Sequence, residues 1–283
     1  MGKLFGVIGD PIGHTLSPAL HEFWYKKDKL SHHYQAFHVL PETLPQAVSG
    51  MKALGISGFN VTIPHKMAII PLLDDIDEEA RMLGAVNTVV NDGGRFIGYN
   101  TDGLGFLKSL QTRFSQFRKG EPYVLVIGAG GAAKAVALTV AKYLAGGLDV
   151  ANRTDEKALR LSAACSRYCP SKVIPFAKVQ NAVPDYDLVI QATSIGLYPN
   201  IEESPLTIHG GKLGTVFADL IYRPFQTRFL SQAKRLGHPT MGGLPMLIYQ
   251  GALAYQKWLG YFPDLEGTEM FLKEKMEDPH AHE

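Results

Sequence analysis

Three features are scarce in this sequence: cysteine, an excess of charge of either sign, and long apolar runs. The 28 basic residues nearly balance the 27 acidic ones, which leaves a formal net charge of +1 on 283 residues. Without a basic block, neither a nucleic-acid partner nor an anionic membrane surface is expected. No apolar run is long enough to span a bilayer. The opening MGKLFGVIGDP lacks the apolar core of a signal peptide, so we expect a cytoplasmic protein.

The only two cysteines, Cys165 and Cys169, lie four residues apart in the segment ALRLSAACSRYC. A structural zinc site needs about four ligands, and no further ligand accompanies this pair. We therefore expect structural thiols and no metal centre.

The pattern of apolar segments in the first third predicts alternating strands and helices. Strands are expected at residues 4–9, 34–39, 58–63, 87–91 and 94–100, and helices at 17–29, 41–55, 65–73, 77–84 and 101–114. Ser17 is expected to be the N-cap of its helix, with Pro18 in the first helical position. Such alternation is typical of an α/β domain with a mostly parallel sheet.

A second α/β unit is expected to begin near Pro122. Strands are predicted at residues 123–127, 148–152, 185–192 and 214–222, and helices at 128–144, 152–168 and 224–237. The last two predicted helices, 242–260 and 266–277, bring no strand with them. We expect them to return to the first domain.

The segment Gly128-Ala129-Gly130-Gly131-Ala132-Ala133 follows a predicted strand and opens a predicted helix. Glycines at such a turn let the backbone approach a pyrophosphate, and the helix N-terminus offers N–H groups to it. The alternative is a glycine-rich turn used only for packing. The strand–turn–helix–strand context favours a Rossmann dinucleotide site.

The end of the second strand of this unit indicates which dinucleotide is bound. NAD sites usually carry an acidic residue there, whereas this chain has Asn152, Arg153 and Thr154, with Lys157 one turn later. A guanidinium and a hydroxyl can bind a 2′-phosphate that a carboxylate would repel. We therefore expect NADP(H).

The stretch NVTIPHK, residues 60–66, reads as the end of a buried strand, where open α/β sheets bind ligands. The candidates for proton transfer are His14, His65, Lys66 and Asp102. The candidates for binding a hydroxylated substrate are Thr15, Ser17, Asn60, Thr62, Asn87, Thr101 and Gln250. Each of these side chains also has an ordinary structural interpretation.

Taken in order, several segments resemble the shikimate dehydrogenase family: GDPIGHTLSPALH, NVTIPHK, GAVNTVV, GYNTDGLGF, VIGAGGAAKA, ANRT, QATSIGL and GGLPMLIYQGALA. The resemblance runs from about residue 4 to about residue 260. It implies NADPH-dependent, reversible reduction of 3-dehydroshikimate to shikimate in the pathway to chorismate and the aromatic amino acids. It also implies a small-molecule substrate and a monomer or homodimer.

The resemblance assigns roles to residues of this chain. Lys66 and Asp102 match the catalytic pair. Around the substrate, the matching residues are Thr15, Ser17, Asn60, Thr62, Lys66, Asn87, Asp102, Tyr222 and Gln250. The cofactor residues are Gly128, Ala129, Gly130, Gly131, Ala132 and Ala133 at the pyrophosphate, Asn152, Arg153, Thr154 and Lys157 at the 2′-phosphate, and Thr193, Ile221 and Gly243, with Tyr222, on the nicotinamide side.

The expected domain plan follows from these roles. Residues 1–103 and 244–283 form a discontinuous substrate domain, and residues 104–243 form a Rossmann NADP domain, with a cleft between them. Two positions depart from the family pattern: Thr15 replaces a common serine and Pro245 a common glycine. The alternatives are a quinate/shikimate dehydrogenase with broader substrate or NAD use, and a non-catalytic NADP-binding sensor. A methylenetetrahydrofolate dehydrogenase is disfavoured, because position 62, four before Lys66, is threonine and not tyrosine.

Overall fold

The computed structural model describes residues 2–277 of the chain, which divide into two compact units. Unit 1 comprises Met1–Thr101 and Gln250–Glu283, and unit 2 comprises Asp102–Tyr249. Within residues 2–277, no helix is both long and apolar enough to cross a membrane.

Unit 1 is built on a six-stranded sheet in the order β2-β1-β3-β5-β6-β4. Its strands are β1 (Leu4–Gly9), β2 (His33–His38), β3 (Gly58–Val61), β4 (Asp75–Ile76), β5 (Thr88–Asp92) and β6 (Arg95–Tyr99). β5 runs antiparallel to both of its neighbours, and the remaining pairs are parallel. The expectation of a mostly parallel sheet is confirmed.

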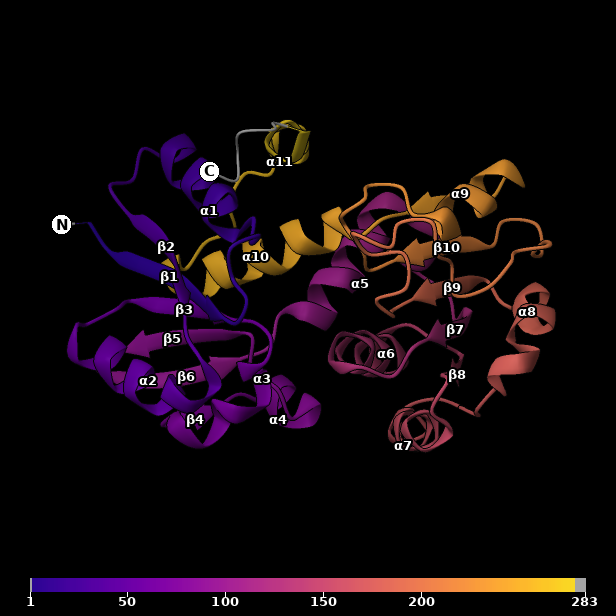
Figure 1. Ribbon diagram of the computed structural model, residues 1–283, viewed down its shortest axis with the longest axis horizontal. Helices are drawn as coiled ribbons and strands as arrows, with labels where there is room; N and C mark the ends of the chain where they lie inside the picture. Colours follow the sequence, from indigo (N-terminus) through magenta and orange to yellow (C-terminus); the bar gives the residue numbers. More distant parts are fainter. Residues whose placement is uncertain (1, 278–283) are drawn as a thin grey trace. The chain divides into compact units, whose positions relative to one another are not determined.

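Helices cover both faces of this sheet (Figure 1). They are α1 (Ser17–Lys27), α2 (Leu44–Ala53), α3 (His65–Ala68), α4 (Glu78–Leu83), α10 (Leu244–Leu259) and α11 (Thr268–Glu277), with short 3-10 turns at Pro41–Thr43 and Ile70–Leu72. On one face, Val48 of α2 packs with Phe59 of β3 in a buried apolar cluster. On the other face, the ring of Phe5 stacks on Trp258 of α10 at 5.0 Å. α11 and most of α10 therefore belong to unit 1, which the chain re-enters at Gln250, inside α10.

Unit 2 holds a five-stranded parallel sheet in the order β11-β10-β9-β7-β8. The strands are β7 (Tyr123–Ile127), β8 (Gly147–Ala151), β9 (Leu188–Gln191), β10 (Val216–Asp219) and β11 (Thr240–Met241). Beyond β8, a single parallel bridge joins Val150 to Val173. This bridge stands where the third strand of a doubly wound nucleotide-binding sheet would lie. Three backbone hydrogen bonds join β8 to this edge segment: Leu148 N to Pro170 O, Val150 N to Lys172 O and Ile174 N to Val150 O.

The helices of unit 2 are α5 (Asp102–Arg113), α6 (Gly131–Tyr143), α7 (Asp155–Cys165), α8 (Val179–Ala182) and α9 (Arg228–Arg235), with 3-10 turns at Ser115–Phe117, Phe176–Lys178 and Val183–Asp185. Phe229 and Leu230 of α9 pack against Phe217 and Leu125 of the sheet. The strand–helix alternation of the predicted Rossmann domain is confirmed. The turns and helix between residues 176 and 185, together with β4 and β11, were not predicted.

The cysteines are buried, with Cys165 ending α7 and Cys169 beyond it. Burial raises the pKa of the Cys165 thiol to about 12. A thiol with so high a pKa is unreactive, which supports the structural role expected for it.

Candidate active site

The NVTIPHK segment leaves the sheet at its carboxyl edge. β3 ends at Val61, and the chain turns through Pro64 into the short helix α3. Lys66 is half-buried, and its backbone carbonyl accepts a hydrogen bond from Val86 N at 2.8 Å. Thus the residue just before Asn87 is tied directly to the backbone of Lys66.

His65, one of the candidates for proton transfer, is buried with 1% exposure. Its Nε2 lies 2.7 Å from the carbonyl oxygen of Val39, which can only accept a hydrogen bond. The ring therefore ties α3 to the segment after β2. We assign His65 a structural role, whereas His14 is exposed.

Asn87 is the centre of a buried hydrogen-bond network. Its Oδ1 accepts from Thr101 N at 2.8 Å and from Thr88 Oγ1 at 2.9 Å. Its Nδ2 donates to Thr101 Oγ1 at 2.9 Å and, over a longer 3.4 Å, to Gln250 Oε1 on α10. Three predicted substrate residues from separate parts of the chain are therefore joined in unit 1.

Asn60 extends this network across β3. Its Nδ2 donates to Asn87 O and to Thr88 Oγ1, both at 3.0 Å. Its Oδ1 accepts from the hydroxyl of Tyr34 at 2.7 Å. Both amide hydrogens of Asn60 are thus used within the protein. Only Oδ1 retains a free lone pair, so Asn60 can offer a ligand an acceptor but no donor.

Thr15 and Ser17 lie on the same side of the network. The Ser17 side chain lies close enough to the Tyr34 hydroxyl to influence its pKa, and Thr15 Oγ1 donates to Ser17 Oγ at 3.2 Å. The expected capping role of Ser17 is wrong: α1 starts at Ser17 and its N-cap is Leu16. The Ser17 N–H instead donates to Thr15 Oγ1 at 3.3 Å, so the hydroxyl of Ser17 is spared from capping.

The network contains two members that sequence reasoning missed, Tyr34 and Thr88. Tyr34 is fully enclosed, with its ring stacked on His21 at a centroid distance of 4.4 Å. Neither ring nitrogen of His21 has a hydrogen-bond partner among residues 2–277. Burial lowers the pKa of His21 to about 3, so the ring is neutral at physiological pH. A tyrosine in a strand rich in aromatic residues gives no sign of this role.

Asp102 begins α5 and is buried with 7% exposure. It directly follows Thr101, whose backbone N–H and hydroxyl both bond Asn87. Thr62, the remaining predicted substrate residue of NVTIPHK, is half-buried, and its N–H is held by Ile8 O at 3.0 Å. The backbones around the predicted substrate residues are therefore firmly anchored.

The glycine-rich turn of unit 2 has the form that a pyrophosphate requires. Gly128 has φ +119°, and a Cβ there would lie 2.8 Å from Ala192 O, so a side chain is excluded by its surroundings. At Gly130 and Gly131 an added Cβ would meet nothing within 4 Å. Gly130 is the N-cap of α6, and no side chain caps it. Open space therefore faces uncapped N–H groups at the positive end of a helix, which suits a dinucleotide phosphate.

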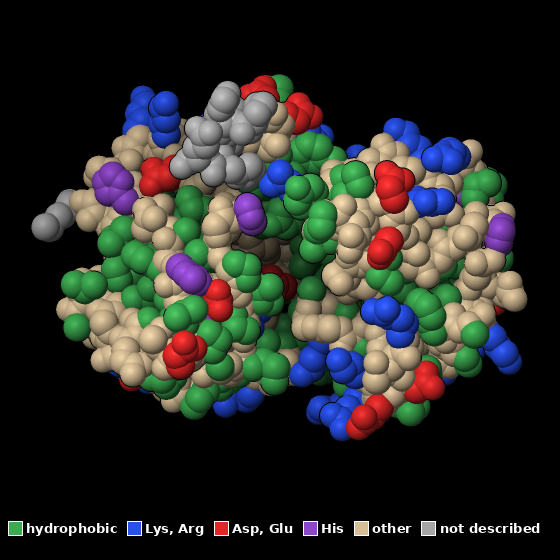
Figure 2. Space-filling model, viewed as in Figure 1, with side chains coloured by type: hydrophobic (Ala, Val, Ile, Leu, Met, Phe, Trp, Pro, Cys, Tyr) green, Lys and Arg blue, Asp and Glu red, His purple; other side chains and the backbone are tan. Residues whose placement is uncertain are grey.

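The predicted 2′-phosphate residues lie where β8 meets α7. Arg153, Thr154 and Lys157 are exposed, and Asn152 Nδ2 holds the turn by donating to Thr154 O at 3.0 Å. Glu156 pairs with Arg160 at 2.5 Å, so its charge is compensated within α7. Figure 2 shows basic side chains gathered over the part of unit 2 in which α6 and α7 lie.

The predicted nicotinamide-side residues follow β9 and β10 and precede α10. Gly243 N donates to Ile221 O at 2.9 Å, and a Cβ at Gly243 would lie 2.1 Å from Leu220 O. Glycine is therefore required there by the close approach of two backbones. Burial raises the pKa of Tyr222, so its hydroxyl stays protonated and can donate a hydrogen bond.

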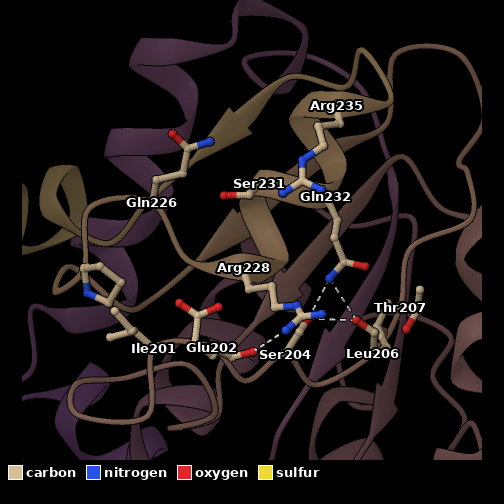
Figure 3. Close-up of a pocket in the computed structure, with 11 residues that line it drawn as sticks. Ile201, Glu202, Ser204, Leu206, Thr207, Gln226, Arg228, Ser231, Gln232 and Arg235 are labelled. Atoms are coloured by element: carbon tan, nitrogen blue, oxygen red, sulfur yellow. Dashed lines mark hydrogen bonds between the residues drawn. The ribbon is translucent and has the colours of Figure 1, made fainter.

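A separate hollow of about 680 Å³ lies between α9 and the segment after β9 (Figure 3). It is lined by Ile201, Glu202, Ser204, Leu206, Thr207, Pro224, Gln226, Arg228, Ser231, Gln232 and Arg235. Arg228 reaches across it and donates to Glu202 O at 2.9 Å. None of the residues predicted from the sequence lines this hollow.

Comparison with known proteins places these features in a family. A family profile described as the shikimate dehydrogenase substrate binding domain matches residues 7–89, and one described as shikimate/quinate 5-dehydrogenase matches residues 110–204. The NADP(+)-dependent shikimate dehydrogenase of Bacillus cereus strain AH820 is 46% identical over 98% of this chain and 99% of its own length. This chain belongs to the shikimate dehydrogenase family.

Solved structures agree with this assignment. A shikimate dehydrogenase in complex with NADP+ superposes with a TM-score of 0.90 at 40% identity, covering 98% of this chain and 96% of its own. The Thermus thermophilus enzyme in complex with NADP(H) and shikimate superposes with a TM-score of 0.86 at 36% identity. The match covers 96% of this chain and 99% of that enzyme. The family, the α/β fold class and an NADP-dependent oxidoreductase, all expected from the sequence, are confirmed.

Proposed function

We propose that this protein interconverts 3-dehydroshikimate and shikimate with NADP(H), and so supplies the pathway to chorismate. The observation that carries this proposal is the network around Asn87. It brings hydroxyl and amide groups from β3, β5, the segment before α5 and α10 together in unit 1. A small ligand with several hydroxyl groups matches such a set of donors and acceptors.

The substrate is bound in unit 1 by groups of two kinds. Thr15 and Ser17 grip its carboxylate through their hydroxyls. The ring and its hydroxyls lie against Asn60, Thr62, Asn87 and Gln250. Tyr222, a residue of unit 2, is a further substrate residue of this proposal. Asn60 accepts and does not donate, because its amide hydrogens are already bonded to Asn87 O and Thr88 Oγ1.

Lys66 and Asp102 are the catalytic pair. Reduction of a ketone builds negative charge on its oxygen, and the Lys66 ammonium stabilises that charge and provides a proton. Asp102 orients the ammonium and accepts a hydrogen bond from a substrate hydroxyl. A lysine beside a carboxylate keeps its charge more readily than one buried alone. NADPH, when bound, supplies the hydride.

The cofactor is held by unit 2. Residues 128–133 present open backbone and the α6 N-terminus to the pyrophosphate. Asn152, Arg153, Thr154 and Lys157 bind the 2′-phosphate. Thr193, Ile221 and Gly243 line the nicotinamide side. The support for this arrangement is that a Cβ added at Gly130 or Gly131 would meet no described residue within 4 Å, together with the exposed basic residues at the α7 N-terminus.

Residues 1–103 and 244–283 serve as the substrate domain and residues 104–243 as the NADP domain. The enzyme works in the cytoplasm as a monomer or homodimer, which light scattering of the purified protein distinguishes.

The deciding experiment follows NADP reduction by absorbance after shikimate is added, with quinate and NAD as controls. Rapid turnover with shikimate and NADP alone is expected. Comparable rates with quinate or NAD would assign the protein to the broader-specificity relatives. Folded protein that binds NADPH but turns over none of these pairs would instead be a sensor.

A further inference from the structure

Asp219 and Gln191 face each other at the carboxyl ends of neighbouring strands. β9 ends at Gln191 and β10 ends at Asp219, and the two residues are partners in the parallel register. Figure 1 shows β9 and β10 side by side in unit 2. Gln191 is 0% exposed and Asp219 is 1% exposed. A carboxyl group and an amide buried so deeply must be fully hydrogen-bonded to be tolerated.

The carboxyl group of Asp219 receives hydrogen bonds from the segment that follows its own strand. Oδ1 accepts from Ile221 N at 2.9 Å, and Oδ2 accepts from Thr227 Oγ1 at 2.7 Å. Thr227 is in turn the N-cap of α9, where its Oγ1 accepts from Leu230 N. One side chain therefore holds both ends of the turn between β10 and α9.

The amide of Gln191 does the same for the turn after β9. Its Nε2 donates to Ile195 O at 3.0 Å, and its Oε1 accepts from Thr193 N. The Gln191 side chain also lies close enough to the Asp219 carboxyl group to lower its pKa. The two turns are thus held by side chains of two residues that are neighbours in the sheet register.

We propose that Asp219, with Gln191, is a positioning residue that sets the nicotinamide-side backbone at Thr193 and Ile221. This inference rests on the proposed cofactor contacts of those two residues. Asp219 itself touches neither cofactor nor substrate. It acts by holding two turns, one from each strand end, in a single arrangement. Gly243 N donates to the Ile221 carbonyl at 2.9 Å. The backbone position of Gly243, a third predicted cofactor residue, therefore depends on that of Ile221.

The two hydrogen bonds to Asp219 come from neutral donors, an N–H and a hydroxyl, and the nearby side chain of Gln191 is a neutral amide. Burial, which outweighs these bonds, raises the pKa of Asp219 to about 7. No cation pairs with this carboxyl among the hydrogen bonds and ion pairs of the described residues. The group is therefore held for its geometry and not as one half of an ion pair.

Unit 2 provides a matched control. Asp149 on β8 is also buried, with 8% exposure, and its carboxylate accepts from Lys172 N at 3.0 Å and Tyr186 Oη at 2.7 Å. Within residues 2–277, the hydrogen bonds and ion pair of Asp149 involve Lys172 and Tyr186, and none involves the turns at Thr193 or Ile221. Asp149→Ala removes a similar set of hydrogen bonds from the same unit without disturbing those turns.

The test compares Asp219→Ala with Asp149→Ala in the full-length enzyme. Kd is measured for NADPH and for adenosine 2′,5′-bisphosphate, which carries the 2′-phosphate but no nicotinamide, and kcat is measured with shikimate. Misplacing a reacting group by about 1 Å can cost roughly 10²-fold in rate. We expect Asp219→Ala to lower kcat by about that factor and to raise the Kd for NADPH. The Kd for the bisphosphate should be unchanged.

Asp219→Asn should recover most of kcat, because an amide can accept from Ile221 N and donate to the Thr227 hydroxyl. If Asp219→Ala does not fold, Thr227→Val removes one of the two bonds and should shift kcat in the same direction. The inference would be overturned if Asp219→Ala and Asp149→Ala lowered kcat equally. It would also be overturned if Asp219→Ala raised the Kd for NADPH and the Kd for the bisphosphate equally. A wild-type enzyme inactive on shikimate would instead reject the proposed function itself.

Discussion

Tyr34 donates a 2.7 Å hydrogen bond to Asn60 Oδ1, and the Ser17 side chain lies close enough to the same hydroxyl to influence its pKa, so one buried hydroxyl connects the start of α1 to β3. Both residues that it connects are predicted substrate residues. The hydroxyl is deeply buried and has no competing solvent. Its position therefore sets the orientation of groups on either side of it.

Replacing Tyr34 with phenylalanine should raise the KM for shikimate several-fold and leave the Kd for NADPH unchanged. The ring and its stacking on His21 are preserved, but Asn60 Oδ1 loses the hydrogen bond that the hydroxyl donates. Leaving a buried group unsatisfied costs about 1–3 kcal/mol, which should also appear in the free energy of unfolding. Tyr186→Phe, which removes a comparable bond to Asp149 in unit 2, should lower stability without changing this KM. An unchanged KM in Tyr34→Phe would show that the hydroxyl does not orient the substrate residues.

Replacing Lys66 with alanine should lower kcat by ~10²–10⁴-fold, the usual contribution of general acid–base help. The affinity for NADPH should change little, because the cofactor residues lie in unit 2. Lys52→Ala serves as the control, since Lys52 pairs with Asp74 at 2.7 Å on the surface of the same unit. Steady-state kinetics of both variants checks this. Turnover retained in Lys66→Ala would reject its catalytic role.

Replacing Arg153 with alanine should weaken the binding of NADP and leave the binding of NAD nearly unaffected. Hydrogen bonds to charged groups contribute about 1.5–3 kcal/mol, so the loss for NADP should be roughly 10- to 150-fold. Arg160→Ala is the matched control, because this arginine lies on α7 but is paired with Glu156. Titration of each variant with both cofactors gives the comparison. Equal weakening of NADP and NAD would make Arg153 structural.

His21 should make the protein sensitive to acid. Its pKa is lowered from 6.5 to about 3 by burial. Between pH 3 and pH 6.5, His21 therefore binds a proton in the unfolded chain but not in the folded one. The stabilisation is fully present above pH 6.5 and is lost as the pH falls toward 3, at roughly 1.4 kcal/mol per pH unit. His21→Phe should flatten this part of the curve of unfolding free energy against pH. The exposed His209→Gln should not, and an unaltered slope in His21→Phe would mean that another group titrates.

The sequence predicted the regular elements well where local signals were strong. The run YVLVI became β7 at Tyr123–Ile127, because β-formers bounded by a proline and a glycine leave little choice. The segment 176–185 was missed because its turns of helix are too short to show a period. The two-residue strands β4 and β11 depend on pairing with β6 and β10, which no local pattern reveals.

The candidate site was predicted in its parts but not in its connections. Motifs pointed to Asn60, Asn87 and Gln250, yet the bonds that join them span 27 and 163 residues along the chain. Tyr34, Thr88 and Asp219 escaped notice because their roles arise only when distant segments are brought together. A buried polar side chain acquires its function from partners that tertiary structure supplies.

The glycine-rich turn allows a sharper test, because two of its glycines are required for different reasons. At Gly130 an added Cβ meets none of residues 2–277 within 4 Å, whereas at Gly128 it would lie 2.8 Å from Ala192 O in a backbone with φ +119°. Gly130→Val should therefore fold with nearly the wild-type melting temperature but lose the rise in melting temperature that NADPH produces in the wild type. Gly128→Val should lower the melting temperature of the protein even without cofactor, since its strain is internal. Thermal unfolding with and without NADPH separates the two. A Gly130→Val variant that is still stabilised by NADPH would place the pyrophosphate elsewhere.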